Sequence, residues 1–326
     1  MNRRECLSML AAVASGAAWA RSAHAQGGQA VSSVPARAIP TIDPPDPNPK
    51  VPAFKPPPKA CDTHTHIFGP ASRYPFAANR PYNAPEAPLE AFRAVHEKIG
   101  VERCVIVNAT VHGTDNRVVT DAIAQSGGAY KGIANVSDEM SDQDLVALDK
   151  GGIRGCRFAF LKRLGGIGDM NKFNRIVHRV AEIGWHVDVY FEAGTIGEFA
   201  GLLRALPAPY VIDHMGTVQA AKGLDDPAFK ALLDLQTSDE KCWVKITGLE
   251  RASAGGKPFD DSVPFAKRLI DNAPDRVLWG TDWPHPNVKM MPNDGEIVDL
   301  IPLYAPDPAI QHKLLVDNPA RLFKFT

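Results

Sequence analysis

Two histidines stand two positions apart in the segment "CDTHTH", at His64 and His66. In a β-strand such a pair lies on one face, because side chains alternate between the two faces. Two imidazoles on one face can bind a metal ion or polarise a carbonyl group. His214, in "VIDHMG", and Asp282, in "GTDWP", each follow another apolar segment. An aspartate close to histidines and arginines ionises readily, so Asp282 is predicted to be the base that activates water.

Three arginines also lie at the ends of apolar segments. Arg157 and Arg163 stand in "RGCRFAFLKR", and Arg251 stands in "TGLER". Arginine binds a carboxylate through two parallel hydrogen bonds. A single arginine is usually a solvated surface charge, so the argument depends on the convergence of all three. Together they predict an anionic substrate, with more than one carboxylate.

Eight short strand-like segments follow residue 58, several of them rich in β-branched or aromatic residues. Amphipathic patterns separate them. In "PLEAFRAVHEKIG", for example, Leu89, Phe92, Val95 and Ile99 recur at helical spacing and Gly100 closes the pattern. The eight segments are "KACDTHTH", "RCVIVNA", "YKGIANV", "IRGCRFAF", "HVDVYFEA", "YVIDHMG", "CWVKITGL" and "RVLWGTDWP".

Strands that alternate with helices predict a parallel sheet covered by helices, and eight such units predict a single (β/α)8 barrel, an α/β fold. An open doubly wound sheet is disfavoured, because no glycine-rich phosphate loop follows the first segment. In a barrel the functional groups lie at the carboxyl ends of the strands. The candidate residues cluster at those ends, and Tyr190, in the fifth segment, joins them.

The beginning of the chain is predicted to be a targeting segment. Arg3 and Arg4 precede a short apolar run, and "AHA" offers a cleavage site after Ala25. Residues 1–25 therefore have the pattern of a twin-arginine signal peptide, which predicts export to the periplasm. Residues 26–57 are predicted to be a proline-rich linker, an extended tether or wrap, and the barrel is expected over residues 58–326.

The composition is that of a globular protein with ample length for a large core. The net charge is −1 and no run of basic residues appears, so a nucleic-acid partner is not indicated. Beyond the signal, no segment approaches the length of a membrane span. None of the four remaining cysteines forms a C-x-x-C pair, and we expect them to be buried thiols. The sequence leaves the oligomeric state open.

From about residue 58 to the C-terminus the sequence resembles the amidohydrolase superfamily, and within it the 2-pyrone-4,6-dicarboxylate lactonases of aromatic degradation. The resemblance implies a (β/α)8 barrel. The stretches "TGLERAS" and "NATVHG" depart from the family pattern. The matching stretches are "HTHIFGP", "YPFAANRPY", "HGTDN", "RGCRFAFLKR", "YFEA", "IDHMG", "WGTDWPHPN" and "DNPARLF".

The resemblance also implies roles for individual residues. His64, His66 and His214 match the histidines that polarise the scissile carbonyl, and Asp282 matches the aspartate that activates water. Substrate contacts are implied for Arg157, Arg163, Arg251, Tyr190 and Tyr82. From its position three residues after Asp282, His285 is expected to orient that aspartate or to contact the substrate.

The lactonases of this family work without a divalent metal, and we predict no cofactor. A binuclear site needs a bridging anionic ligand on the fourth strand, where Arg157 stands instead. One zinc or manganese ion, held by His64, His66 and Asp282, is the alternative.

The sequence thus predicts a metal-independent hydrolase of a carboxylated lactone such as 2-pyrone-4,6-dicarboxylate. Two other enzymes remain open, a sugar-acid lactone isomerase and a mononuclear-metal amidohydrolase or decarboxylase. A periplasmic protein that only binds dicarboxylates is the alternative from another class. Asp282 argues against it, because capture of an anion gains nothing from a carboxylate in the site.

Overall fold

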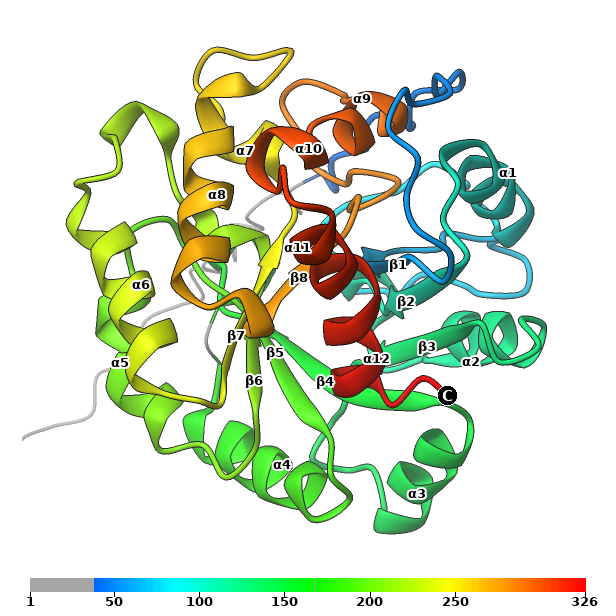
Figure 1. Cartoon of the computed structure of the whole chain (residues 1–326). Helices are drawn as coiled ribbons and strands as arrows, with labels where there is room; N and C mark the ends of the chain where they lie inside the picture. Colours follow the sequence, from blue (N-terminus) through cyan, green and yellow to red (C-terminus); the bar gives the residue numbers. More distant parts are fainter. Residues whose placement is uncertain (1–37, 167) are drawn as a thin grey trace, which may run out of the picture. The chain divides into compact units, whose positions relative to one another are not determined.

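The computed structural model describes residues 38–166 and 168–326 (Figure 1). The predicted signal peptide, residues 1–25, lies outside the described residues, as do residues 26–37 of the predicted linker. Ile39–Thr326 form one compact unit. Within the described ranges, no helix combines the length and the apolar character that crossing a membrane requires.

Eight parallel strands form one sheet in the order of the sequence, each paired with the next (Figure 1). This arrangement confirms the predicted (β/α)8 barrel. The apolar side chains of Val105, Val107, Ile133 and Val211 form part of a core cluster on the strands. The strands are β1 Cys61–Thr65, β2 Arg103–Val107, β3 Tyr130–Ala134, β4 Ile153–Ala159, β5 His186–Tyr190, β6 Tyr210–Ile212, β7 Cys242–Ile246 and β8 Val277–Trp279.

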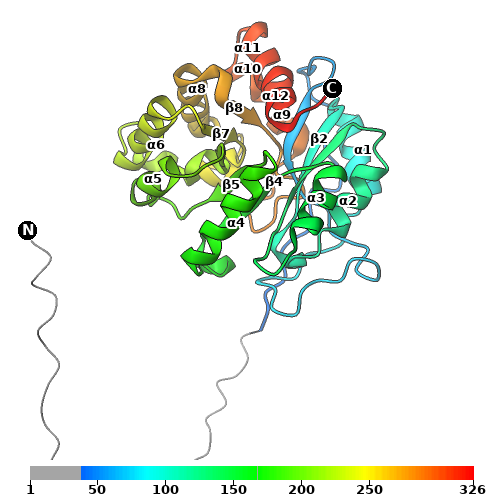
Figure 2. The same cartoon turned by 90° about the horizontal axis from the view of Figure 1, so that it is seen from below.

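Helices surround the strands on the outside (Figures 1 and 2). The first of them, α1, buries Leu89, Phe92, Val95 and Ile99, the residues whose spacing predicted it, and ends at Gly100 with a φ of 76°. The helices are α1 Leu89–Ile99, α2 Arg117–Ala124, α3 Asp142–Lys150, α4 Met170–Glu182, α5 Ile196–Arg204, α6 Pro227–Ser238, α7 Leu249–Ala252, α8 Val263–Asn272, α9 Asp294–Asp299, α10 Ile301–Tyr304, α11 Pro308–His312 and α12 Asn318–Phe323.

The segment that follows β8 is joined to β1 by hydrogen bonds. The amide of Asp282 donates to the carbonyl of His64 at 2.8 Å, and the amide of His66 donates to the carbonyl of Trp283 at 2.7 Å. Gly280 permits this approach, because a Cβ there would lie 2.8 Å from the backbone nitrogen of His64. The junction brings Asp282 against the two histidines, although more than two hundred residues separate them in the sequence.

The described part of the proline-rich segment packs against the barrel as a wrap. The amide of Phe54 donates to Oδ1 of Asp299 at 2.9 Å, and the ammonium of Lys50 lies 2.7 Å from the other oxygen of that carboxylate. The amide of Lys50 also donates to Asn293 at 2.9 Å. These bonds fasten the segment to α9 and to the residue before it.

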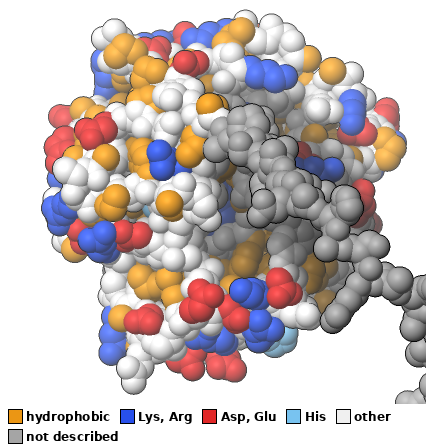
Figure 3. All heavy atoms as spheres, turned by 180° about the vertical axis from the view of Figure 1, so that it is seen from behind, with side chains coloured by type: hydrophobic (Ala, Val, Ile, Leu, Met, Phe, Trp, Pro, Cys, Tyr) orange, Lys and Arg blue, Asp and Glu red, His pale blue; other side chains and the backbone are white. Residues whose placement is uncertain are grey.

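Acidic and basic side chains are interspersed on the face shown in Figure 3, without a continuous area of one sign on the coloured residues. The absence of a nucleic-acid partner stays a prediction.

Candidate active site

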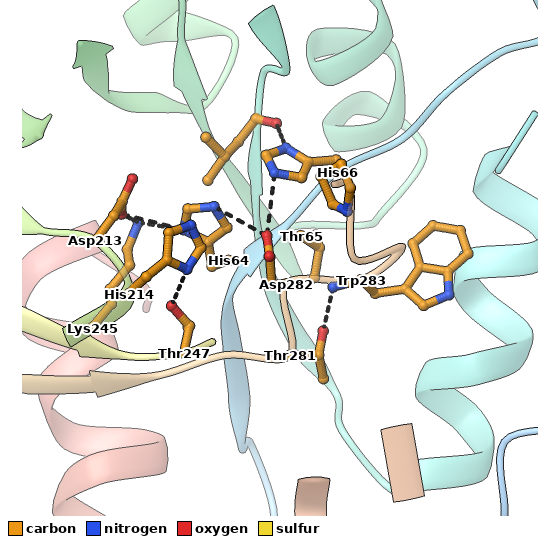
Figure 4. A network of polar contacts seen from close by, with 12 residues as sticks. His64, Thr65, His66, Asp213, His214, Lys245, Thr247, Thr281, Asp282 and Trp283 are labelled. Atoms are coloured by element: carbon orange, nitrogen blue, oxygen red, sulfur yellow. Dashed lines mark hydrogen bonds and ion pairs between the residues drawn. The ribbon is translucent and has the colours of Figure 1, made fainter. Parts of the chain in front are cut away.

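The side chains of His64, His66 and Asp282 meet at the carboxyl ends of β1 and β8 (Figure 4). Oδ1 of Asp282 lies 3.6 Å from Nε2 of His64 and 3.4 Å from Nε2 of His66. His214, which follows β6, joins them, with its ring centroid 4.7 Å from that of His64. All four side chains are buried. The structure therefore brings together the four residues that were predicted to be catalytic.

The backbone is bent where these side chains enter the site. His214 and Asp282 have φ angles of 51° and 69°, in the left-handed region that residues with a Cβ rarely adopt. Such conformations cost free energy and cluster at functional sites. The left-handed backbone turns the side chains of His214 and Asp282 from their short loops towards the site.

Arg251 is paired with Asp282. Its Nε and Nη2 donate to Oδ2 of Asp282 at 3.1 and 2.5 Å, and Nη2 also donates to the carbonyl of Pro286 at 2.8 Å. Burial alone would raise the pKa of the Asp282 carboxyl, but Arg251, His214 and His66 outweigh it and hold that pKa well below its usual range. Asp282 is thus a carboxylate near neutral pH, with Oδ1 directed at the histidines.

The other predicted anion-binding residues form a second group. Arg157 donates to Oδ2 of Asp213 at 2.7 Å, and its guanidinium lies 5.1 Å from the centre of the Tyr190 ring. Arg163 donates to the hydroxyl of Tyr190 at 3.3 Å. Tyr82 is buried and lines the same cavity as Arg157 and Arg163. The structure places these residues side by side, and their substrate contacts stay predictions.

Sequence reasoning missed a buried ionic network beneath the histidines, centred on Lys245 of β7 (Figure 4). Its ammonium lies 2.5 Å from Oδ2 of Asp188 and 3.2 Å from Oδ1 of Asp213, and all three side chains are completely buried. Burial alone would lower the pKa of Lys245, but the two carboxylates outweigh it and raise that pKa. Lys245 is therefore an ammonium ion, and Asp213 links it to Arg157.

A signal for this network was present in the sequence. Lys245 interrupts the apolar segment "CWVKI", and Asp188 interrupts "HVDVY". A charged residue in the middle of a strand that is buried on both faces must have a buried partner of opposite charge. Two such strands in one barrel predict that the partners are each other.

The ammonium of Lys245 determines where His64 carries its proton. Nζ of Lys245 and Oδ1 of Asp213 both lie 3.3 Å from Nδ1 of His64, but only Lys245 has the geometry of a hydrogen bond with it, and Oδ1 of Asp213 has no hydrogen-bond partner among the described residues. Because an ammonium group only donates, Nδ1 accepts, and a neutral His64 carries its hydrogen on Nε2. Nε2 is buried and has no hydrogen-bond partner among the described residues. It is a donor directed towards Oδ1 of Asp282, 3.6 Å away.

His66 has the opposite arrangement. Its Nδ1 lies 2.7 Å from the carbonyl oxygen of Val107, which can only accept, so this nitrogen carries the hydrogen. Nε2 of His66 consequently presents a lone pair to the site when the ring is neutral, and donates only when the ring is protonated. Nδ1 of His214 is bonded to the hydroxyl of Thr247 at 2.7 Å, which permits either tautomer.

Two of the histidines are held neutral. Burial lowers the pKa of His64 to about 4, despite the attraction of Asp213. Burial also holds the pKa of His214 well below its usual value, despite the attraction of Asp282. Both imidazoles are therefore uncharged near neutral pH.

Two adjoining cavities open beside these residues. The larger has a volume of about 520 Å³, and Arg163, Tyr190, His214, Glu250 and Arg251 are part of its lining. The smaller, of about 20 Å³, is bordered by His66, Tyr82 and Asp282. A volume of roughly this size accommodates one water molecule. The site thus offers space for a small organic molecule next to space for a water.

His285 lies behind the aspartate and lines neither of these two cavities. Its Nε2 is 3.1 Å from Oδ1 of Asp294, and its amide donates to the carbonyl of Asp282 at 2.6 Å. Burial alone would lower its pKa, but Asp294 outweighs this and raises the pKa of His285. From this position His285 can stabilise the loop that carries Asp282.

The same residues could hold one metal ion. Donor atoms of His64, His214 and Asp282 lie within 4.8 Å of one another, and Nε2 of His64 and Oδ1 of Asp282 have no hydrogen-bond partner in the described chain. The neutral tautomer of His66 also suits a ligand, because ligating histidines commonly donate their other N–H to a backbone carbonyl. The tautomer set by Lys245 opposes a metal at His64, because it leaves no lone pair on Nε2.

Residues 61–325 match the family model described as amidohydrolase. The chain belongs to the amidohydrolase family. It is 44% identical over 285 residues to the 2-pyrone-4,6-dicarboxylate hydrolase of Comamonas testosteroni, an alignment that covers 85% of this chain and 93% of that protein. It is 43% identical over 275 residues to the 4-sulfomuconolactone hydrolase of Rhizobium radiobacter, covering 83% and 92%.

A solved structure extends the likeness to three dimensions. The crystal structure of the probable 2-pyrone-4,6-dicarboxylic acid hydrolase of Acinetobacter baumannii, with citric acid bound, matches this chain with a TM-score of 0.71 at 25% identity. The match covers 82% of this chain and all of that chain (100%). The predicted family is confirmed, and this amidohydrolase is an enzyme of the hydrolase class.

The ionic network yields a prediction for stability. Lys245→Met leaves Asp213 paired with Arg157 but takes the ammonium group away from Asp188, whose other ionisable contact is His186 at 3.3 Å. Breaking a buried ion pair on one side costs about 3–5 kcal/mol. The double variant Lys245→Met/Asp188→Asn removes one charge of each sign, so we expect it to recover at least half of that loss. Denaturant-induced unfolding measures both variants. A single variant as stable as the wild type would contradict the account.

Proposed function

We propose that this amidohydrolase hydrolyses a small lactone that carries an acidic group, without a metal ion. The names of its two relatives support the substrate class, since one acts on a pyrone dicarboxylate and the other on a sulfonated muconolactone. The hydrogen bond between Lys245 and Nδ1 of His64 carries the mechanistic part, because it makes Nε2 of His64 a donor rather than a ligand. A carboxylated lactone such as 2-pyrone-4,6-dicarboxylate is a member of this class.

The acidic group of the substrate binds the cationic side of the cavity. Arg157, Arg163 and Tyr190 present their guanidinium groups and hydroxyl there, with Tyr82 alongside. Guanidinium groups bind carboxylates and sulfonates alike through paired hydrogen bonds. Binding at this place brings the lactone carbonyl towards the histidines.

Asp282 activates the water. Asp282 borders the cavity that has room for one water, and Arg251 holds Oδ2 of its carboxylate in place. Oδ1 takes a proton from water as the oxygen attacks the lactone carbonyl. The pairing with Arg251 makes Asp282 a weak base in isolation, so the step depends on stabilisation of the negative charge that develops on the carbonyl oxygen.

The histidines supply that stabilisation. Nε2–H of His64 donates to the developing oxyanion, and His214 does the same in its Nε2–H tautomer. His66 adds a third donor when its ring is protonated. One such donor typically contributes about 2.7–4 kcal/mol to transition-state stabilisation. When the tetrahedral intermediate collapses, the ring C–O bond breaks and the departing oxygen takes the proton from Asp282.

A hydrolase that uses one metal ion is the second candidate function. The lone pair that the neutral His66 ring presents favours it. His64, His214 and Asp282, or His66 in place of His214, would hold the ion, which would polarise the carbonyl or lower the pKa of bound water. The cations Lys245, Arg157 and Arg251 crowd the same place and disfavour a further positive charge.

The role of Asp282 is testable by Asp282→Asn, which keeps the shape of the side chain but cannot accept the proton. We expect kcat for lactone hydrolysis to fall at least about a hundredfold, with substrate affinity retained. Asp121→Asn, far from the site beside Arg73 and Tyr74, is the control and should leave kcat unchanged. A kcat for Asp282→Asn within a few-fold of the wild type would remove it from the mechanism.

The metal question has a separate prediction. Purified enzyme should contain far less than one metal ion per chain by mass spectrometry, should keep its activity after prolonged chelation, and should gain nothing from added zinc or manganese. His64→Asn should nevertheless lower kcat about 10²–10³-fold, because an oxyanion donor is lost. Stoichiometric metal whose removal abolishes turnover and whose return restores it would establish the second candidate instead.

The same assay separates the remaining alternatives by its product. Hydrolysis opens the ring to a hydroxy or keto acid, an isomerase returns another lactone, and a protein that only binds gives no product.

A further inference from the structure

Tyr82 reaches the site from a loop that belongs to neither a helix nor a strand of the barrel. Its side chain is 5% exposed and lines the smaller cavity together with Arg157 and Arg163. Burial raises the pKa of Tyr82, so its hydroxyl keeps the proton and can donate a hydrogen bond. Since no helix or strand carries Tyr82, contacts outside the barrel's regular elements must fix its position.

The proline-rich wrap supplies such contacts through Asn83. The amide of Asn83 donates to the carbonyl of Pro40 at 2.7 Å, and its carbonyl accepts from the amide of Ile42 at 3.0 Å. Nδ2 of Asn83 donates to the carbonyl of Ile39 at 3.2 Å, and Oδ1 accepts from Nε of Arg80 at 2.7 Å. The residue that follows the cavity-lining tyrosine is therefore bonded to the wrap through both its backbone and its side chain.

A second asparagine fastens the wrap further along. Asn293, which caps α9, accepts from the amide of Lys50 at 2.9 Å and donates to Oδ2 of Asp46 at 2.9 Å. Oδ1 of its neighbour Asp294 lies 3.1 Å from Nε2 of His285, in the loop of the proposed base. Between the two asparagines, the wrap borders a cavity of about 300 Å³ that His285 also lines. The wrap thus connects two loops of the site.

The wrap is stiff between these two attachments. Five of the twelve residues 39–50 are prolines, each with a fixed φ. A proline-rich segment behaves as a semi-rigid spacer and loses little conformational freedom when it is held in place. A stiff segment that is fastened at both ends can fix the loop that is bonded to it.

We propose that residues 39–50 belong to the framework of the active site, and that Asn83 is a positioning residue that holds Tyr82 at the cationic side of the cavity. Asn83 lines neither cavity of the site and acts through the Tyr82 hydroxyl, which donates to an acidic group of the substrate beside Arg163. The inference rests on the proposed function and adds to it a requirement for the wrap. A loosened loop leaves a smaller binding-competent fraction of the enzyme, and the apparent affinity falls by that fraction.

Hydrolysis of 2-pyrone-4,6-dicarboxylate tests this role by a double-mutant cycle. Asn83→Ala should raise KM about five- to tenfold and leave kcat within about twofold, because the loop binds the acidic group and Asp282 is untouched. Tyr82→Phe should also raise KM. The double variant should be no more than about twofold worse than Tyr82→Phe, since one residue acts through the other. Ile42→Pro removes the amide that donates to the carbonyl of Asn83, and it should act in the same direction as Asn83→Ala.

Asn272→Ala is the matched control. The side chain of Asn272 joins α8 to α6, since it donates to the carbonyl of Leu233 at 3.1 Å and to Oε1 of Gln236 at 2.9 Å, and it lines neither cavity of the site. Its loss should lower stability without changing KM. An Asn83→Ala enzyme with the KM of the wild type, additive effects in the double variant, or a fall in kcat at constant KM would overturn the inference.

Binding separates this inference from the proposed function. Benzene-1,3-dicarboxylate carries two carboxylates in the same relative positions on a six-membered ring as the pyrone, but it has no bond to hydrolyse. By calorimetry, Asn83→Ala should weaken its binding about five- to tenfold, again without additivity with Tyr82→Phe. A wild type that hydrolyses no lactone but shows this cycle would refute the proposed function and leave the role of Asn83 in place. Lactone hydrolysis whose KM shows no such cycle would do the reverse, and a wild type that neither hydrolyses a lactone nor binds the probe would refute both.

Discussion

A lysine ammonium group can be buried in a barrel only if carboxylates surround it, and this requirement organises the interior of the protein. Lys245 contacts Asp188 and Asp213, and its remaining contact is Nδ1 of His64. The charge that balances two buried aspartates therefore also bonds to the ring of His64, the histidine that we propose polarises the lactone carbonyl. Asp213 extends the network to Arg157, so the residues proposed to bind the anion and those proposed to polarise the carbonyl share one electrostatic support.

The candidate site also depends on the junction between β8 and β1. Backbone hydrogen bonds hold Asp282 beside His64 and His66, and left-handed backbone at Asp282 and His214 turns their side chains inward. Arg251 then pairs with one oxygen of Asp282 and leaves the other facing the histidines. In the proposed mechanism, this precise placement of the base and its oxyanion donors is what lets a carboxylate of low pKa assist the attack of water.

The sequence predicted the barrel because the spacing of apolar residues and the number of strand-like segments can be read locally. It predicted the candidate site residues because a barrel brings the carboxyl ends of all its strands together at one end. It did not reveal that Arg251 pairs with Asp282 rather than lying open to a ligand, since that depends on loop conformation after β7 and β8. Sequence reasoning also missed the pairing of Lys245 with Asp188, although a charged residue inside each of these two apolar segments indicated a buried ion pair.

The position of the ring proton on His64 tests the central claim most directly. Nitrogen-15 NMR of histidine-labelled enzyme, with His64→Asn used to assign the signals, distinguishes the protonated from the unprotonated ring nitrogen. At neutral pH the account predicts an unprotonated Nδ1, bonded to Lys245, and a proton on Nε2. A proton on Nδ1 and a lone pair on Nε2 would contradict it, because His64 would then be an acceptor or a metal ligand rather than the donor that polarises the lactone carbonyl.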